Sequence, residues 1–393
     1  MTNVFSLIAA EHARQQSTIE LIASENFVSE NVLRAVGSCL TNKYAEGYPG
    51  ARYYGGCENV DVIEVYCREK WREAFGTDYH VNVQPHSGSN ANLAAFMAVL
   101  KPGDTILSMD LNHGGHLTHG AAVNISGKLF RVIHYGVTPD GLIDYDDLRG
   151  KILAYRPQLV LAGASAYSRI IDFQRIYADI MELALYNGLF PTPIFMADMA
   201  HIAGLVVSGD HPSPFGCADI ITTTTHKTLR GPRGGMIFCK PEFAKRIDSA
   251  VFPGVQGGPL LHVIAGKAVA AEEACEPAFK NYIHAVVKNS QAMASEFQRM
   301  GYKVVTGGTD NHLFLLDLTE TGLTGKQVQD ELDRHGITLN KNCVPGETRS
   351  PRETSGVRIG TAAMTTKGFT RADFCLVAHK VDRVIRELRA HQA

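Results

Sequence analysis

Runs rich in β-branched and apolar residues alternate with runs of helical periodicity, and this alternation limits the possible folds more than any other feature. Helical spacing of apolar residues occurs over 59–75 and 90–100. Strands separated by helices form a mainly parallel sheet that helices cover on both faces. The sequence therefore predicts an α/β fold with strands at 105–109, 129–135, 158–164, 193–199, 220–225 and 236–240.

The pattern changes after residue 240, where long helices are predicted over 259–274 and 282–300. Shorter runs follow, which predict a helix at 325–335 and strands at 302–306, 312–318, 337–340 and 357–360. A chain of 393 residues has the length of two domains or three. We place an N-terminal arm and a large domain in residues 1–270, and a smaller C-terminal α/β domain in residues 271–393.

The composition is that of a folded protein with balanced charge. The 38 Lys and Arg residues against 40 Asp and Glu leave no basic surplus for a nucleic-acid backbone. No run reaches the ~18 consecutive apolar residues that a membrane span needs. The eight cysteines show no C-x-x-C pair, and the N-terminus lacks a secretory pattern. We therefore expect a cytoplasmic protein with reduced thiols and with no nucleic-acid or membrane partner.

The run 220–235 ends a β-branched strand in His226-Lys227 and continues into a turn rich in Gly and Pro. Lysine is rarely buried, and a desolvated lysine with a lowered pKa can form a Schiff base. A solvated lysine at the surface end of a strand explains the same residues equally well from spacing alone. The apolar run 194–197 ends similarly in Asp198, which would need a cationic partner at depth or would cap the next helix.

Two further segments carry polar residues beside predicted strands or helices. The small residues of the stretch from His86 to Asn92 lie at the start of a predicted helix. The N–H groups at that helix start would favour a phosphate, although an ordinary Ser cap explains the same residues. His113 to His119 holds three histidines at a spacing of three. The segment lacks an H-E-x-x-H pattern and any acidic residue, so we favour stacking of an imidazole on an aromatic cofactor over a metal, and we expect no metal site.

Together these segments resemble the serine hydroxymethyltransferase family, which consists of fold-type I enzymes dependent on pyridoxal 5'-phosphate. The resemblance covers residues 20 to about 370 in family order. The matching stretches are 20–26, 41–50, 52–57, 84–89, 113–120, 198–205, 222–235, 252–259, 307–312 and 355–361.

The resemblance implies a seven-stranded sheet and specific roles at the cofactor. Lys227 would form the Schiff base, Asp198 would pair with the pyridine nitrogen, and His116 would stack on the ring. His201 would hydrogen-bond the phenolic oxygen. The implied cofactor-binding set is Ser87, Gly88, Ser89, His116, Ser165, Asp198, His201, Lys227, Tyr44, Gly257 and Gly258, of which Tyr44 and the two glycines would come from a neighbouring subunit.

The same resemblance implies sites for the amino acid and for tetrahydrofolate. Arg358 would clamp the substrate carboxylate bidentately, which a lysine could not copy, with help from Ser24, Tyr54 and His201. Glu46 of a neighbouring subunit would handle the proton of the substrate hydroxyl. The implied catalytic set is Lys227, Glu46, Asp198, His116, His226 and Tyr54. The implied folate-binding set is Glu46, Tyr53, Leu111, Gly115, His116, Leu117, Asn342, Ser350, Pro351 and Arg352.

The implied activity is the reversible transfer of the serine hydroxymethyl carbon to tetrahydrofolate, which gives glycine and 5,10-methylenetetrahydrofolate. Sites built from two chains imply a homodimer or a tetramer. Arg352 departs from the family pattern near the folate, so folate-independent aldol cleavage of β-hydroxy amino acids and α-methylserine transfer remain alternatives. A paralogue kept only for binding would have lost Lys227, Asp198 or Arg358, and all three are present. The long stretch 186–193 is either a surface loop or a disturbance of the next strand.

Overall fold

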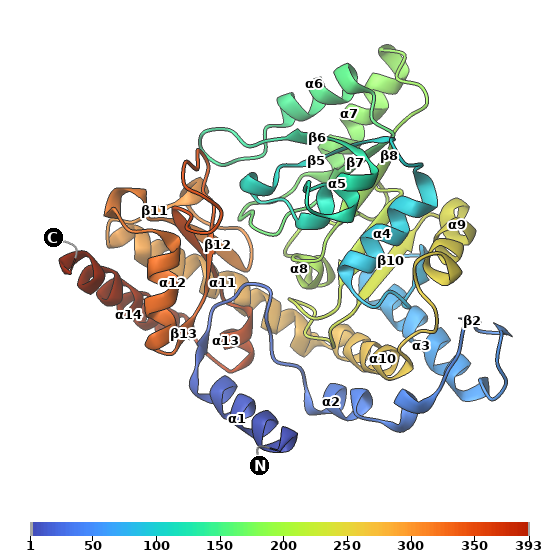
Figure 1. Ribbon diagram of the computed structural model, residues 1–393, viewed down its shortest axis with the longest axis horizontal. Coiled ribbons are helices and arrows are strands. Elements are labelled where there is room, and N and C mark those ends of the chain that lie inside the picture. The colour runs from blue at the N-terminus through green and yellow to red at the C-terminus, as the bar shows by residue number, and fades with distance from the viewer. Residues whose placement is uncertain (1–2, 392–393) are drawn as a thin grey trace.

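A computed structural model describes residues 3–391 and contains a large sheet of seven strands (Figure 1). The strand order is β4-β10-β9-β8-β7-β5-β6, and only β10 runs against its neighbours among the strands described. The predicted fold class is therefore confirmed. The bounds are β4 (His80–Asn82), β5 (Thr105–Met109), β6 (Arg131–Tyr135), β7 (Leu159–Ala162), β8 (Ile194–Asp198), β9 (Ile220–Thr224) and β10 (Gly235–Cys239).

Helices cover both faces of this sheet because consecutive strand residues point to opposite sides. Ile106 packs with α4 (Gly88–Val99) and α9 (Ala244–Ser249), whereas its neighbour Leu107 packs in the core of the other face. That second core contains the buried side of α3 (Glu58–Phe75). The other helices of this region are α5 (Ile125–Leu129), α6 (Tyr145–Tyr155), α7 (Phe173–Tyr186), α8 (Ala203–Ser208) and α10 (Leu261–Cys275).

A second, antiparallel sheet lies in the C-terminal part, in the order β11-β12-β15-β14. Its core is separate, and α11 (Pro277–Arg299) contributes Ile283 to the first core and Phe297 to the second. The domain division at residue 270 stays a prediction. The bounds are β11 (Lys303–Val304), β12 (Leu313–Asp317), β14 (Asn340–Asn342), β15 (Gly356–Gly360), α12 (Gly325–Arg334), α13 (Ala362–Thr366) and α14 (Arg371–Ala390).

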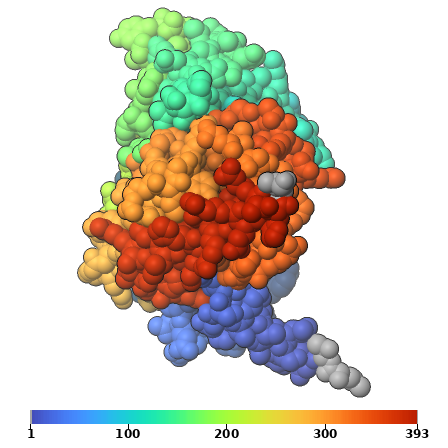
Figure 2. Space-filling view, turned by 90° about the vertical axis from the view of Figure 1, so that its left-hand side faces the viewer, coloured from blue at the N-terminus to red at the C-terminus, as the bar shows by residue number. Residues whose placement is uncertain are grey.

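The N-terminal segment reaches across to the C-terminal sheet region. Strand β1 (Ile19–Glu20) pairs in parallel with β13 (Ile337–Thr338), so the predicted strand 337–340 divides between this pair and β14. Helix α1 (Val4–Ser17) buries none of its described side chains and projects from the body of the molecule (Figure 2). After it come α2 (Glu30–Val36) and the short hairpin of β2 (Gly47–Tyr48) and β3 (Ala51–Arg52).

The stretch 186–193 is a surface loop, with Phe190 exposed over 87% of its area, and it leaves the pairing of β8 with β7 and β9 regular. Among residues 3–391, we find no helix with the length and apolarity that crossing a membrane requires.

Candidate active site

A cavity of about 340 Å³ opens beyond the carboxyl ends of β8 and β9, where open α/β sheets commonly bind ligands. Residues from both sheets contribute to its wall. The lining includes Ser24, Ser87, Gly88, Ser89, Asn92, His116, His119, Ser165, Asp198, His201, His226, Lys227 and Arg358. The structure thus brings most of the predicted cofactor residues into one cavity.

Asp198 ends β8 and is held as a carboxylate. His119 Nε2 and Asn92 Nδ2 both donate to its Oδ2, at 3.0 and 2.9 Å. Burial alone raises the pKa of this carboxyl, but the hydrogen bonds from His119 and Asn92 outweigh it and lower the pKa well below its usual range. The backbone N–H of Ala200 also donates to Oδ1, at 3.0 Å, so the carboxylate caps the following turn as well as facing the cavity.

Lys227 follows β9 and is only 7% exposed. Burial lowers the pKa of its amine to about 8, although the charge of Asp198 opposes the shift. Its carbonyl oxygen is fixed by Asn26 Nδ2 at 2.9 Å and by the Arg230 N–H at 3.1 Å. Within residues 3–391, by contrast, the Nζ atom has no hydrogen-bond partner, so the amine is free to react in the cavity.

The N-terminus of α4 forms another part of the cavity wall. Ser87 caps this helix, because its hydroxyl accepts from the Asn90 N–H at 3.2 Å, as the simpler interpretation of the sequence expected. A Cβ atom at Gly88 would lie 2.6 Å from Cγ2 of Thr224, so glycine permits the helix start to approach β9 closely. The first N–H groups of the helix can receive an anion such as a phosphate.

Two histidines of the cavity, His116 and His226, are neutral. Burial lowers the pKa of His116 to about 4 and that of His226 to about 3. His116 Nδ1 lies 2.7 Å from the hydroxyl of Thr118, which fixes the ring. Among residues 3–391, no group of three or more His, Cys, Asp or Glu side chains is arranged to hold a metal ion, and His119 instead binds Asp198.

Arg358 reaches the cavity from β15 of the C-terminal sheet. Its Nη1 donates to the carbonyl of Ser165 at 2.7 Å, and its Nε donates to Oδ1 of Asn340 at 3.0 Å. Burial lowers the pKa of the guanidinium to about 10. No carboxylate of residues 3–391 lies within 4.0 Å of this cation. A half-buried cation without a counter-ion is suited to an anionic substrate group.

A second group of predicted residues lies outside this cavity, on and beside the hairpin. Tyr44, Tyr53 and Tyr54 are 57%, 74% and 49% exposed. Tyr44 Oη donates to Oε1 of Glu46 at 3.2 Å. Gly257 and Gly258 lie next to these two side chains, since a Cβ atom at each would be 3.2 Å from Glu46 and 3.3 Å from Tyr44, respectively.

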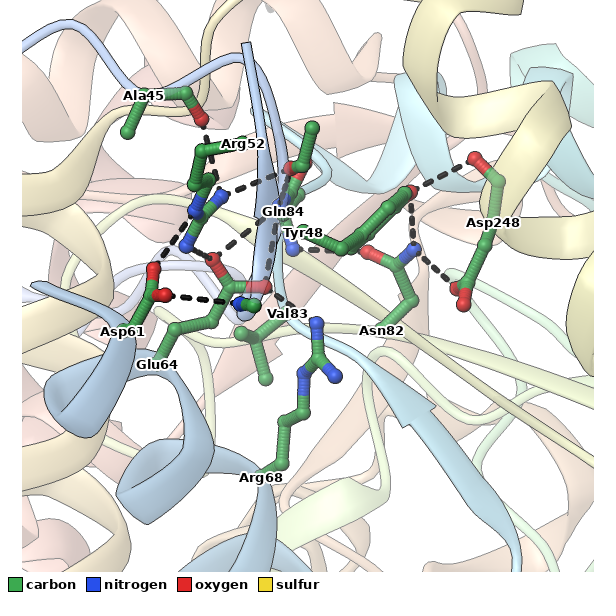
Figure 3. A network of polar contacts seen from close by, with 12 residues as sticks. Ala45, Tyr48, Arg52, Asp61, Glu64, Arg68, Asn82, Val83, Gln84 and Asp248 are labelled. Carbon is green, nitrogen blue, oxygen red and sulfur yellow. Dashed lines mark hydrogen bonds and ion pairs between the residues drawn. The ribbon is translucent and has the colours of Figure 1, made fainter. Parts of the chain in front are cut away.

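A buried polar network holds the hairpin in place (Figure 3). Arg52 Nη1 donates to the carbonyls of Ala45 and Gly47, at 2.9 and 2.8 Å, and so fixes the backbone on both sides of Glu46. Its Nη2 donates to the fully buried carboxylate of Glu64 at 2.7 Å. The hairpin is therefore a rigid, exposed structure although it contributes nothing to the described lining of the cavity.

Apart from His116, the predicted folate residues lie outside the described lining of the cavity. Leu111 and Leu117 are 42% and 48% exposed, and Gly115 lies buried between them. Asn342 ends β14, and Ser350, Pro351 and Arg352 follow in an exposed loop.

The sequence does not predict that Asn92 and His119 donate hydrogen bonds to Asp198. Asn92 lies in the predicted helix 90–100, and His119 lies in the three-histidine segment, which was interpreted as stacking. The sequence carries no direct signal for either contact, because 106 and 79 residues separate the partners.

A mostly parallel seven-stranded sheet with a lysine-bearing cavity at its strand ends is the arrangement of fold-type I enzymes dependent on pyridoxal 5'-phosphate. A family model described as serine hydroxymethyltransferase matches residues 1–381, and the chain belongs to this family. Its cofactor is pyridoxal 5'-phosphate and its co-substrate is tetrahydrofolate. The chain is thus a transferase that exchanges serine and glycine through a one-carbon unit carried by tetrahydrofolate.

Proposed function

We propose that the cavity at β8 and β9 is the cofactor site, with Lys227 as the covalent attachment point and Asp198 at the pyridine nitrogen. The observation that carries this assignment is that the Lys227 amine is free while the Asp198 carboxylate is held ionised in the same cavity. The bound cofactor supplies an electron sink for the bond that breaks at the substrate Cα. Asp198 supports it by keeping the ring nitrogen protonated.

The other groups of the cavity fit the remaining parts of the cofactor. We propose that Ser87, Gly88 and Ser89 hold the phosphate at the N-terminus of α4. Neutral His116 would lie against the ring, because an uncharged imidazole can stack without competing for the positive charge near Asp198. Ser165 and His201 would bind the phenolic edge, and His226 would support Lys227 from the adjacent position.

We propose that Arg358 binds the carboxylate of serine and glycine, because its half-buried cation has no carboxylate partner among residues 3–391. Its two existing hydrogen bonds, to Ser165 and Asn340, orient the guanidinium and leave Nη2 uncommitted in the described part of the chain. Ser24 would assist at the same carboxylate. These contacts would orient the amino acid so that the bond to be broken meets the cofactor correctly.

We further propose that the hairpin serves the cavity of a second copy of the chain. Glu46, Tyr44, Tyr53 and Tyr54 lie together but outside their own cavity. Helix α1 supports an assembly, since Val4, Phe5, Leu7 and Ile8 are each more than half exposed. In such a homodimer Glu46 would handle the proton of the substrate hydroxyl, with Tyr54 beside it, while Tyr44, Gly257 and Gly258 would complete the phosphate site.

A trapping experiment tests the cofactor assignment. Borohydride reduction of the holoenzyme fixes the cofactor to its lysine, and peptide mass spectrometry locates the added mass. We expect the mass on Lys227. The equally buried Lys267 is an internal control, and a mass there would contradict the assignment.

A subunit-mixing experiment tests the shared site. Lys227→Ala and Glu46→Gln chains are each expected to be inactive. Reassembled mixtures contain hybrid dimers with one intact site, so about a quarter of the wild-type activity should return. If mixtures stay as inactive as their components, Glu46 acts within its own chain or not at all.

We propose that tetrahydrofolate lies along Leu111, Gly115, Leu117 and Asn342, with Tyr53 and Glu46 of the second chain and the loop Ser350 to Arg352 around it.

A cytoplasmic location also remains a prediction; all eight cysteines are free thiols, which supports it. Folate-independent aldol cleavage stays a prediction that serine turnover without tetrahydrofolate would test.

A further inference from the structure

Two buried histidines meet at the wall of the cavity, where the large sheet region contacts the C-terminal sheet. His201 lines the cavity, and His312 lies directly before β12 with no exposed area. Nδ1 of His201 and Nε2 of His312 are 3.1 Å apart, and the ring planes differ by 28°. The two imidazoles are therefore joined by an N–H···N hydrogen bond.

Both rings are neutral in this environment. They are buried, and the cations facing them are Lys227 and Arg358. Burial and these charges lower the pKa of His312 to about 3 and that of His201 well below its usual range. A neutral imidazole carries one N–H, so one ring donates in this hydrogen bond and the other accepts.

The surroundings of Nδ1 of His312 show which of the two rings donates the hydrogen bond. His312 Nδ1 is buried and has no hydrogen-bond partner within residues 3–391. If His312 accepted through Nε2, its only proton would be on Nδ1, as a buried N–H without an acceptor. Buried orphan N–H groups are rarer and more costly than unused acceptors. His312 therefore donates from Nε2, and the proton of His201 must lie on its own Nε2.

The main chain holds both rings in position. The carbonyl of His312 accepts from the Thr361 N–H at 3.0 Å, and the carbonyl of His201 accepts from the Thr228 hydroxyl at 3.0 Å. Nδ1 of His201 is bonded to His312, so Nε2 of His201 is the ring nitrogen that can contact a ligand in the cavity.

We propose that His312 is a positioning residue that holds His201 as the Nε2–H tautomer, so that the cavity is offered a hydrogen-bond donor instead of an acceptor. Such a donor selects an oxygen that carries negative charge. The identity of that oxygen as the phenolic oxygen of the cofactor rests on the proposed function of the site. The tautomer itself does not depend on that assignment.

Neutron diffraction from deuterium-exchanged holoenzyme crystals tests the tautomer directly. We expect deuterium on Nε2 of His312 and on Nε2 of His201, with none on Nδ1 of His312. Deuterium on Nδ1 of His201, or on both nitrogens of either ring, would overturn the proposal. Because this experiment uses the wild-type protein, it does not depend on whether a variant folds.

Variants test the consequence for binding. His312→Leu removes the donor at similar volume, whereas His312→Gln keeps an N–H near the position of Nε2. We expect the Kd of pyridoxal 5'-phosphate to rise about tenfold for His312→Leu and to stay within about threefold for His312→Gln. A merely structural role would lower the melting temperature and the affinity of both variants alike, and that result would contradict the proposal.

A double variant, together with the behaviour of the wild-type chain, distinguishes a failure of this inference from a failure of the proposed function. In a His201→Phe chain, His312→Leu should not weaken cofactor binding further, and a full additional tenfold loss would overturn the coupling. If borohydride reduction places the cofactor on a lysine other than Lys227, the proposed assignment of the site is wrong while the neutron result still stands. If the wild type binds it and His312→Leu binds it equally well, this inference alone is wrong.

Discussion

Two lysines are buried in this enzyme, one in the cavity and one behind it, and they share the same lowered basicity. Lys227 is 7% exposed and Lys267, on α10, is 1% exposed. Burial lowers the pKa of each amine to about 8. Burial and pKa therefore do not distinguish the amine that we propose to react from the one that makes structural contacts.

Their hydrogen bonds do distinguish them. Lys267 Nζ donates to the carbonyls of Val83, Pro85 and Gly235, at 2.6, 3.1 and 2.8 Å. These three bonds use every donor of the ammonium and join β10 to the segment that leads into Ser87. Lys227 Nζ has no such partner among residues 3–391. A buried lysine is free to react when the surrounding backbone leaves its donors unused.

The largest difference between the two lysines should appear on removing Lys227. Lys227→Met should lower the formation of glycine from serine by a factor of about 1,000 or more, because no other amine of the cavity can hold the cofactor. The free energy of unfolding should rise near neutral pH, since Nζ makes no hydrogen bond in the described chain and burial of the amine, which lowers its pKa, destabilises the wild-type fold there. Single-turnover assays and urea denaturation measure both, and substantial residual turnover would contradict the assignment.

Lys267→Met should show the opposite pattern. Three buried carbonyls lose their donor, so we expect a loss of roughly 3 kcal/mol or more in the free energy of unfolding. Lys280, exposed on α11, provides a matched control, and Lys280→Met should change stability by less than about 0.5 kcal/mol. Equal denaturation midpoints for the two variants would show that the three contacts contribute nothing.

Arg358 extends the comparison to a half-buried cation that uses only part of its hydrogen-bond donors. Arg358→Lys should lower kcat/KM for serine about 100-fold, or about 2.7 kcal/mol, because an ammonium cannot bind a carboxylate bidentately. Arg383→Lys, on the exposed side of α14, is the matched control and should be neutral. A loss confined to folate kinetics would place Arg358 elsewhere in the mechanism.

The smallest effect is the pH dependence of stability. Above pH 8 the folded chain releases the proton of Lys227, while the unfolded chain keeps it until about pH 10.5. The unfolded state then binds more protons, so the destabilisation that this buried lysine imposes near neutral pH is relieved as the pH rises. Between pH 7 and 9.5 the wild-type apoenzyme should gain about 2 kcal/mol relative to Lys227→Met. Parallel stability curves from urea titrations would mean that Lys227 is solvated.

Most strand positions along the chain were predictable from the sequence, and most of the cavity residues were implied by the family resemblance. The alternation of apolar runs and helical runs predicted six of the seven strands, because each signal is local and repeats with the period of its element. Strand β4 was missed, since three residues, His80 to Asn82, carry too short a pattern. Lys227 and Asp198 drew attention because charged residues at the ends of buried strands are unusual, but their spacing left bland alternatives open and their roles were implied only by the family resemblance.

Other features were decided only when distant segments met. Nothing near Lys267 in the sequence shows that its amine would reach carbonyls more than 180 residues earlier in the chain. The hydrogen bond between His201 and His312 likewise joins two sheets across 111 residues.

Which residues have side chains able to react can be read from the amino-acid sequence, because side-chain chemistry and strand position are local properties. Which of those side chains are left without hydrogen-bond partners depends on how distant segments pack together. Whether a buried donor is satisfied depends on backbone groups brought from elsewhere in the chain, and the periodicity of a single segment carries no information about those groups.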